Sequence, residues 1–228
     1  QDYKRAIILG SKQTFGKGTV QNVIDLNRII SGGTHGDLGA VKITTDKFYR
    51  INGGSTQLEG VRSDIILKNQ YSYIDMGEKD QENPLTWDSI EPASYKQWGN
   101  QANYQYALSQ SANRLKDNPY MQLVEQQARR IEAQKDDYVY NLNYEDYLTE
   151  QETNKKISDK FSVLKDYKSD LTFEWVPDSG VLTDEVVKER KDRWVETLQK
   201  DFYISEAVSI LEDLNINLDN YPVAQIKK

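Results

Sequence analysis

Apolar residues are spaced differently in the two parts of the chain. In the first part they form short runs or alternate with polar residues, as in Ala6–Leu9, Thr19–Leu26 and Val41–Ile51. Such runs indicate β-strands, and Asn52-Gly53-Gly54 marks a turn after the third. Val61–Leu67 predicts a further strand. The first part is therefore expected to be rich in strands.

In the second part the apolar residues recur at helical spacing. Asn118-Pro119 has the composition of an N-cap followed by proline at the first helical position. The predicted buried stripes are Tyr104, Ala107, Leu108, Ala112 and Leu115; Met121, Val124, Ala128 and Ile131; Ile157, Phe161 and Leu164; Val187, Trp194 and Leu198, with Thr183 as the cap; and Ile204, Ala207, Val208, Leu211 and Leu214. The second part is expected to be all-helical.

Charge changes at the same place along the chain. Residues 1–75 carry 10 basic and 7 acidic side chains, whereas residues 76–228 carry 19 and 29. Most glycines precede residue 61. We therefore predict two domains, 1–75 and 76–228. The net charge of −7 argues against nucleic-acid binding through phosphate contacts, and no run approaches the roughly 20 apolar residues of a membrane span.

Counting excludes several kinds of active site. The chain has no cysteine, which rules out thiol catalysis, disulfides and thiolate metal sites. Its one histidine, His35, lies in a glycine-rich loop and is interpreted as a surface residue. A histidine-rich zinc site is excluded because the chain has one histidine and no cysteine. We expect no metal and no cofactor.

The stretch Gly10–Gln21 sets Lys17 between two glycines after a short apolar run. It is not a phosphate-binding loop, because five residues separate Gly10 from Gly16 and a glycine follows the lysine. A neutral lysine can instead serve as general base for a serine hydroxyl, since burial lowers its pKa towards working pH. Flanking glycines let backbone approach such a site closely. An exposed loop lysine is the alternative.

Several segments resemble the C-terminal processing peptidases, and most closely the bacterial tail-specific protease branch. The resemblance is dense up to residue 90 and weaker near Phe202–Val208. Its segments are Asp2–Ala6, Gly10, Thr14–Gln21, Lys47–Gln57, Gly60-Val61, Asp64–Ile66 and Leu85–Ile90.

The resemblance implies roles for three residues. Lys17 matches the general base of a Ser/Lys dyad, and Gln21 matches a glutamine that orients this lysine in some members. Four residues span about 13 Å in a straight strand, so contact between the two side chains requires a bend. Asp2 resembles an aspartate that matters for activity in this branch. An equally good interpretation is that Asp2 is a structural hydrogen-bond acceptor.

The family's nucleophilic serine and its PDZ module lie upstream of the matched lysine. The resemblance therefore implies a C-terminal fragment that is inactive alone, from a periplasmic serine endopeptidase that selects proteins by an apolar C-terminal tail. Association with the inner-membrane surface is part of the same expectation. The implied fold is α+β or α/β: an incomplete ClpP/crotonase-like protease subdomain followed by a helical domain. Missing strands would leave an exposed sheet edge.

Two other interpretations of residues 76–228 stay open. The helices could form an interaction platform for a partner or adaptor protein, without catalysis of their own. They could also be an ordinary cap that only stabilises the sheet.

Overall fold

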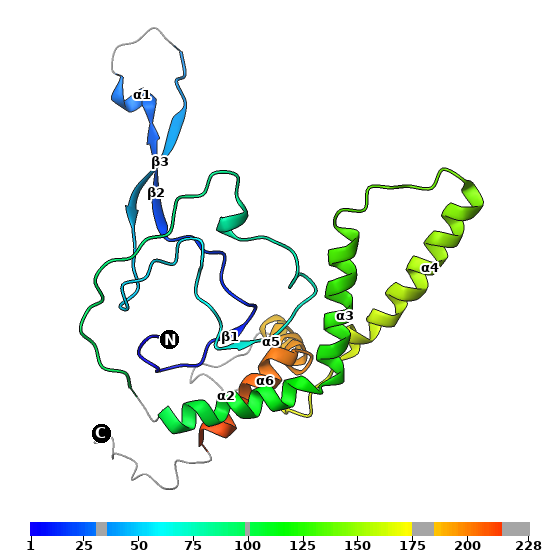
Figure 1. The fold of residues 1–228 in the computed structure, drawn as a ribbon. Helices are drawn as coiled ribbons and strands as arrows, with labels where there is room; N and C mark the ends of the chain where they lie inside the picture. The colour runs from blue at the N-terminus through cyan, green and yellow to red at the C-terminus, as the bar shows by residue number, and fades with distance from the viewer. Residues whose placement is uncertain (31–35, 99–100, 175–184, 216–228) are drawn as a thin grey trace. The chain divides into compact units, whose positions relative to one another are not determined.

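The computed structural model describes residues 1–30, 36–98, 101–174 and 185–215 (Figure 1). It is a mixed α and β structure with a helical C-terminal part, as the sequence predicted. Two compact units alternate along the chain. Unit 1 comprises residues 1–8, 12–63 and 75–99, and unit 2 comprises residues 9–11, 64–74 and 100–228. The predicted boundary between residues 75 and 76 stays a prediction.

Unit 1 contains an antiparallel ribbon of β2 (Thr19–Asp25) and β3 (Ala40–Lys47), with the short helix α1 (Leu26–Ile29) following β2 (Figure 1). Asp25 is the N-cap of α1, and its side chain accepts a hydrogen bond from the Asn27 N–H. The ribbon register shifts between Val20 and Gln21, which is the irregularity of a β-bulge.

The rest of unit 1 is built mainly from loops and turns. A 3-10 helix, η1, spans Glu78–Asp80. The predicted continuation of a strand through residues 48–51 is wrong, because β3 ends at Lys47 and only Tyr49 forms a bridge, to Ser55. The predicted turn at residues 52–54 is confirmed. Gly53 has φ +83°, and a Cβ there would lie 2.2 Å from the Ile90 carbonyl oxygen.

Unit 2 begins with a parallel pair of two-residue strands, β1 (Leu9–Gly10) and β4 (Ile65–Ile66). Both are shorter than the predicted strands at residues 6–9 and 61–67. The difference has a local cause, because the flanking backbone forms other contacts: Ser63 donates to the Lys12 carbonyl at 3.2 Å.

Five helices make up most of unit 2. They are α2 (Gln101–Lys116), α3 (Pro119–Gln134), α4 (Tyr144–Ser162), α5 (Glu185–Gln199) and α6 (Phe202–Asn215), with the 3-10 helix η2 (Val163–Asp166) after α4. The predicted start of α3 is confirmed: Asn118 is the N-cap, its side chain accepts from the Met121 N–H at 3.1 Å, and Pro119 follows.

The core of unit 2 joins residues that are far apart in sequence. Leu67 is 1% exposed and packs with Met121, Val124 and Phe202. The ring of Tyr120 stacks on Phe202 at a centroid separation of 4.9 Å. Burial of these side chains is the main stabilising contribution to the unit. The predicted α3 stripe is confirmed at its three buried positions, Met121, Val124 and Ala128.

The predicted buried face of α6 is wrong. Its buried residues are Phe202, Glu206, Ile210 and Asp213, whereas Leu211 is 58% exposed. The reason is a polar contact with α2: the guanidinium of Arg114 lies 2.8 Å from Glu206 Oε1 and 2.6 Å from Asp213 Oδ2.

Two other predicted stripes are only partly correct. In α4, Phe161 is buried but Ile157 is exposed. In α5, Trp194 is 56% exposed and no described residue of the helix is buried. Most residues of α4 and α5 are polar. Their few apolar residues do not form a stripe wide enough to bury one side of either helix. Thr183, the predicted cap, lies outside the described residues.

Candidate functional site

The loop that carries Lys17 is fixed by its two flanking glycines. The Gly16 carbonyl accepts from the Leu58 N–H at 2.7 Å, and the Gly18 N–H donates to Gln57 Oε1 at 2.9 Å. Gly16 has φ +94°, and a Cβ on Gly18 would lie 2.5 Å from the Gln57 nitrogen. Real Cβ atoms do not approach backbone so closely, so both positions require glycine. This confirms the expected close approach of backbone.

Gln57 holds this arrangement together, although no role was predicted for it from the sequence. It is fully buried, accepts from Gly18, and donates Nε2–H to Glu78 Oε1 at 3.3 Å and to the Leu85 carbonyl at 3.1 Å. The Glu78 N–H in turn donates to the Phe15 carbonyl at 2.7 Å. The feature of the sequence that could have indicated this role is the position of Gln57 in a turn-rich stretch just before Gly60.

Lys17 has a fixed backbone and an exposed side chain. The Thr56 hydroxyl donates to the Lys17 carbonyl at 3.1 Å, while the ammonium Nζ lies 2.8 Å from Gln21 Oε1. The structure thus brings together the two residues that the resemblance pairs. It also differs from the buried lysine that the chemistry calls for, because the described residues leave the Lys17 side chain exposed.

The contact between Lys17 and Gln21 lies beside an irregularity of the ribbon. Lys17 precedes β2, which begins at Thr19, so the regular strand covers only part of the distance between the two residues. Val20 pairs with Asp46 and Gln21 with Thr44, so the extra residue at the register shift lies on β3. The bend that the spacing predicts between Lys17 and Gln21 stays a prediction.

Asp2 is held elsewhere in unit 1. Its carboxylate accepts two hydrogen bonds from Arg50, at 2.6 and 2.8 Å, and one from Asn52 Nδ2 at 3.2 Å. Bidentate pairs of this kind fix geometry as well as charge. Among the described residues no contact joins Asp2 to Lys17, so the structure supports the structural alternative for this aspartate.

Other candidate groups add little in the parts of the chain that are described. His35, the single histidine, lies outside them. No cluster of three or more acidic or histidine side chains there is arranged to hold a metal ion. None of the described helices is long and apolar enough to cross a membrane.

Comparison with known proteins decides the family. Residues 71–215 match the family model described as the C-terminal domain of tail specific protease, which is more than half of the chain. The chain belongs to the tail-specific protease family. Residues 1–67 match the model of peptidase family S41. The family match thus includes both the Lys17 loop and the helices of unit 2.

Two curated relatives agree with this assignment. A tail-specific protease of Haemophilus influenzae is 48% identical over 100 residues, which cover 44% of this chain and 14% of that protein. A carboxy-terminal-processing protease of Bartonella bacilliformis is 40% identical over 68 residues, covering 30% of this chain and 13% of that protein. The matched part of the chain therefore spans only a small share of the length of either relative.

Proposed function

We propose that Lys17 is the general base of a Ser/Lys dyad in a serine endopeptidase, and that Gln21 orients it. The observation that carries the proposal is the 2.8 Å contact between Lys17 Nζ and Gln21 Oε1, in a loop whose backbone is held on both sides by residues 56–58. The family assignment supports a protease, and the contact supports this lysine as its base.

The proposed mechanism needs a nucleophile that comes from another part of a longer protein. Neutral Lys17 accepts the proton of a serine hydroxyl as the oxygen attacks the scissile carbonyl, and then returns it to the leaving amine. Gln21 holds the amine so that its lone pair faces the serine. This chain alone is expected to have no peptidase activity.

Desolvation is the second requirement of the proposed dyad. A lysine acts as a base in its neutral form, which removal of water from around the amine favours, and the Lys17 side chain is exposed. We infer that the segment bearing the serine, together with bound substrate, covers it. The proposed substrates are proteins with apolar C-terminal tails, cleaved in the periplasm, with attachment to the inner-membrane surface as a further expectation.

The test compares Lys17→Ala with Lys12→Ala in a longer protein that includes the upstream segment. Lys12 is an exposed lysine in the same loop region and serves as the matched control. Loss of a general base lowers kcat by about 100- to 10,000-fold, whereas the control is expected to keep full activity. Near-normal cleavage by Lys17→Ala, with an unchanged circular dichroism spectrum, would rule out the base assignment.

A second candidate function is binding of a partner or adaptor protein by the helical part. Four consecutive or near-consecutive apolar residues between α3 and α4 are strongly exposed: Tyr138, Val139, Tyr140 and Leu142, at 76 to 96%. Tyrosine-rich exposed patches are typical of protein interfaces. In a longer protein that includes the upstream segment, replacing Tyr140 and Leu142 by serine should abolish capture of the partner without changing cleavage of an unfolded protein.

A further inference from the structure

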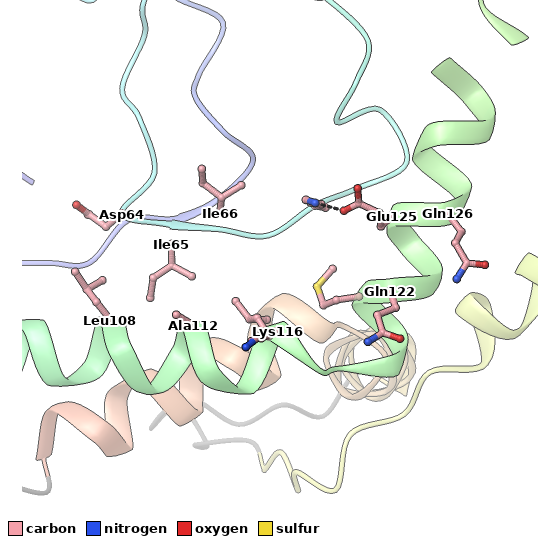
Figure 2. A pocket seen from close by; sticks show the side chains of 12 residues that line it. Asp64, Ile65, Ile66, Leu108, Ala112, Lys116, Gln122, Glu125 and Gln126 are labelled. Atoms are coloured by element: carbon pink, nitrogen blue, oxygen red, sulfur yellow. Dashed lines mark hydrogen bonds and ion pairs between the residues drawn. The ribbon is translucent and has the colours of Figure 1, made fainter. Parts of the chain in front are cut away.

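A cavity of about 730 Å³ lies within unit 2, between β4 and the corner formed by α2 and α3 (Figure 2). It takes no residue from the Lys17 loop. The apolar residues that line it come from β4 and from the successive helices α2 and α3: Ile65, Ile66, Leu108, Ala112, Leu115 and Met121. This volume is typical of a ligand site.

One wall of the cavity is a short apolar row on α2. Leu108, Ala112 and Leu115 follow one another at helical spacing, and Figure 2 shows Ile65 directed towards Leu108 and Ala112. Ala112 is exposed although it lies between two leucines. Its small side chain leaves space for another apolar group.

The charges around the cavity leave one cation available. Lys68 forms an ion pair with Glu125, which also accepts from the Tyr73 hydroxyl. Asp64 is hydrogen-bonded to Tyr104. By contrast, Lys116 has no hydrogen-bond or ion-pair partner among the described residues, although it lines the same cavity.

The strand beside the cavity has an unpaired edge. Among the described residues β4 pairs only with β1, and no residue of β1 lines the cavity. The Leu67 N–H points towards β1, where it donates to the Gly10 carbonyl at 2.8 Å. Because backbone directions alternate along a strand, the N–H and C=O of Ile66 point away from β1. They are available to a further strand.

We propose that this cavity binds an extended apolar peptide segment that ends in a free carboxylate. The peptide backbone pairs with β4 at Ile66, its apolar side chains lie against Ala112 and its neighbours, and its carboxylate contacts Lys116. The inference rests on the proposed function for the source of such peptides, namely the tails of substrate proteins. The site would hold a tail away from the cleavage chemistry.

Charge argues against a second copy of this chain as the occupant. A symmetric pair of cavities would bring the same unpaired Lys116 from each copy to one interface, where like charges repel. A carboxylate is the complementary group. An apolar ligand without an anion would leave Lys116 beside it without a partner.

The test uses the 228-residue chain and a short fluorescent peptide ending in Leu-Val-Ala-Val, with binding measured by fluorescence anisotropy. The free acid is expected to bind about fivefold more tightly than the same peptide with a C-terminal amide, as for one partly exposed ion pair. Methylating the peptide's backbone nitrogens at alternate residues should weaken binding, since it prevents strand pairing.

Two variants locate the site. Lys116→Gln should abolish the preference for the acid while leaving amide binding unchanged, and Lys156→Gln, an exposed lysine on α4, is the matched control. Ala112→Trp fills the cavity and should weaken both peptides by about tenfold or more. Ala133→Trp, at an exposed position of α3, should leave binding unchanged.

Three results would overturn the inference, once circular dichroism shows that each variant is folded. They are equal binding of acid and amide, unchanged binding by Ala112→Trp, and a dimer in sedimentation that dissociates in Ala112→Trp. The result is independent of the dyad, because binding needs no cleavage. In the 228-residue chain, Lys17→Ala should therefore bind the peptide as the parent chain does. This holds whatever Lys17→Ala does to proteolysis in a longer protein, which tests the dyad and not the cavity.

Discussion

The side-chain oxygen of Gln57 accepts a hydrogen bond from the backbone N–H of Gly18 at 2.9 Å, with Gln57 fully buried. This contact fixes the position of the residue that follows Lys17. The candidate general base is therefore held by a buried amide from a segment 39 residues away, while its own side chain stays exposed.

Replacing Gln57 by alanine should destabilise unit 1 and displace the lysine loop. The Gly18 N–H and the Leu85 carbonyl would lose their buried partner, at a cost of about 1–3 kcal/mol each. Denaturant unfolding measures the loss. Gln81→Ala, at an exposed glutamine of the same unit, is the control and should change stability little.

Gly18→Ala should be as harmful as Gln57→Ala. The added Cβ would lie 2.5 Å from the Gln57 nitrogen and 2.8 Å from Ser55 Oγ, and overpacking of this kind costs about 1–3 kcal/mol. Gly36→Ala is a useful comparison, since a Cβ there meets no atom within 4 Å and only its φ of +74° opposes the change. A melting temperature for Gly18→Ala equal to that of the parent chain would contradict the close packing.

Removing Arg114 should leave two buried carboxylates without a cation, and Glu206 would keep only the hydrogen bond from the Ser111 hydroxyl. Arg114→Met is expected to destabilise unit 2 by about 3 kcal/mol, because it removes the cation that offsets the burial of the Glu206 and Asp213 side chains. Adding Glu206→Gln and Asp213→Asn to this variant should restore much of the stability. If the triple variant unfolds as easily as the single one, the charges are not the cause.

The N-cap of α3 offers a smaller and cleaner test. Asn118→Ala removes the acceptor of the Met121 N–H and should cost about 1 kcal/mol, whereas Asn118→Asp should be nearly neutral. Thermal unfolding followed by circular dichroism measures both. Equal destabilisation by the two substitutions would mean that the side-chain oxygen does not cap the helix.

The hydrogen bonds that the Asp37 carboxylate accepts in the turn before β3 should weaken when pH falls far enough to protonate it. Its Oδ1 accepts from the Gly39 N–H at 2.9 Å and from Asn27 Nδ2 at 2.7 Å, and these bonds lower the pKa of the carboxyl below 3.8. Both bonds favour the ionised form, so they persist at neutral pH and weaken only as pH falls through that lowered pKa.

The Gly39 amide chemical shift, followed by NMR through an acid titration, is the measurement for this turn. The shift should change with a midpoint below 3.8. In Asp37→Asn the acid-dependent change should disappear. A midpoint at or above 3.8 in the parent chain would show that the two hydrogen bonds do not hold the carboxylate.

Local signals in the sequence predicted local structure well. Asn118-Pro119 marked the start of α3 correctly, because a cap and its helix are adjacent in the chain. The turn at residues 52–54 was predicted for the same reason. The helical C-terminal part followed from the spacing of its apolar residues.

What the sequence did not predict depends on distant partners. The buried face of α6 includes Glu206 and Asp213, which a search for apolar stripes excludes. Their burial is compensated by Arg114 and, for Glu206, by the Ser111 hydroxyl, both on α2. The strands β1 and β4 are short because their flanking residues join other loops. The pairing of Lys17 with Gln21 came from the family resemblance, since its spacing alone argued against contact.

The core of unit 2 has a consequence for the order of events during synthesis. Leu67 packs with Phe202, and the hydroxyl of Tyr203 donates to the Leu67 carbonyl across 136 positions of the chain. A ribosome must therefore release α6 before this core can close, and contacts of such long range form slowly. Until then Leu67 and the strand beside it remain exposed on the nascent chain, where a chaperone could bind them.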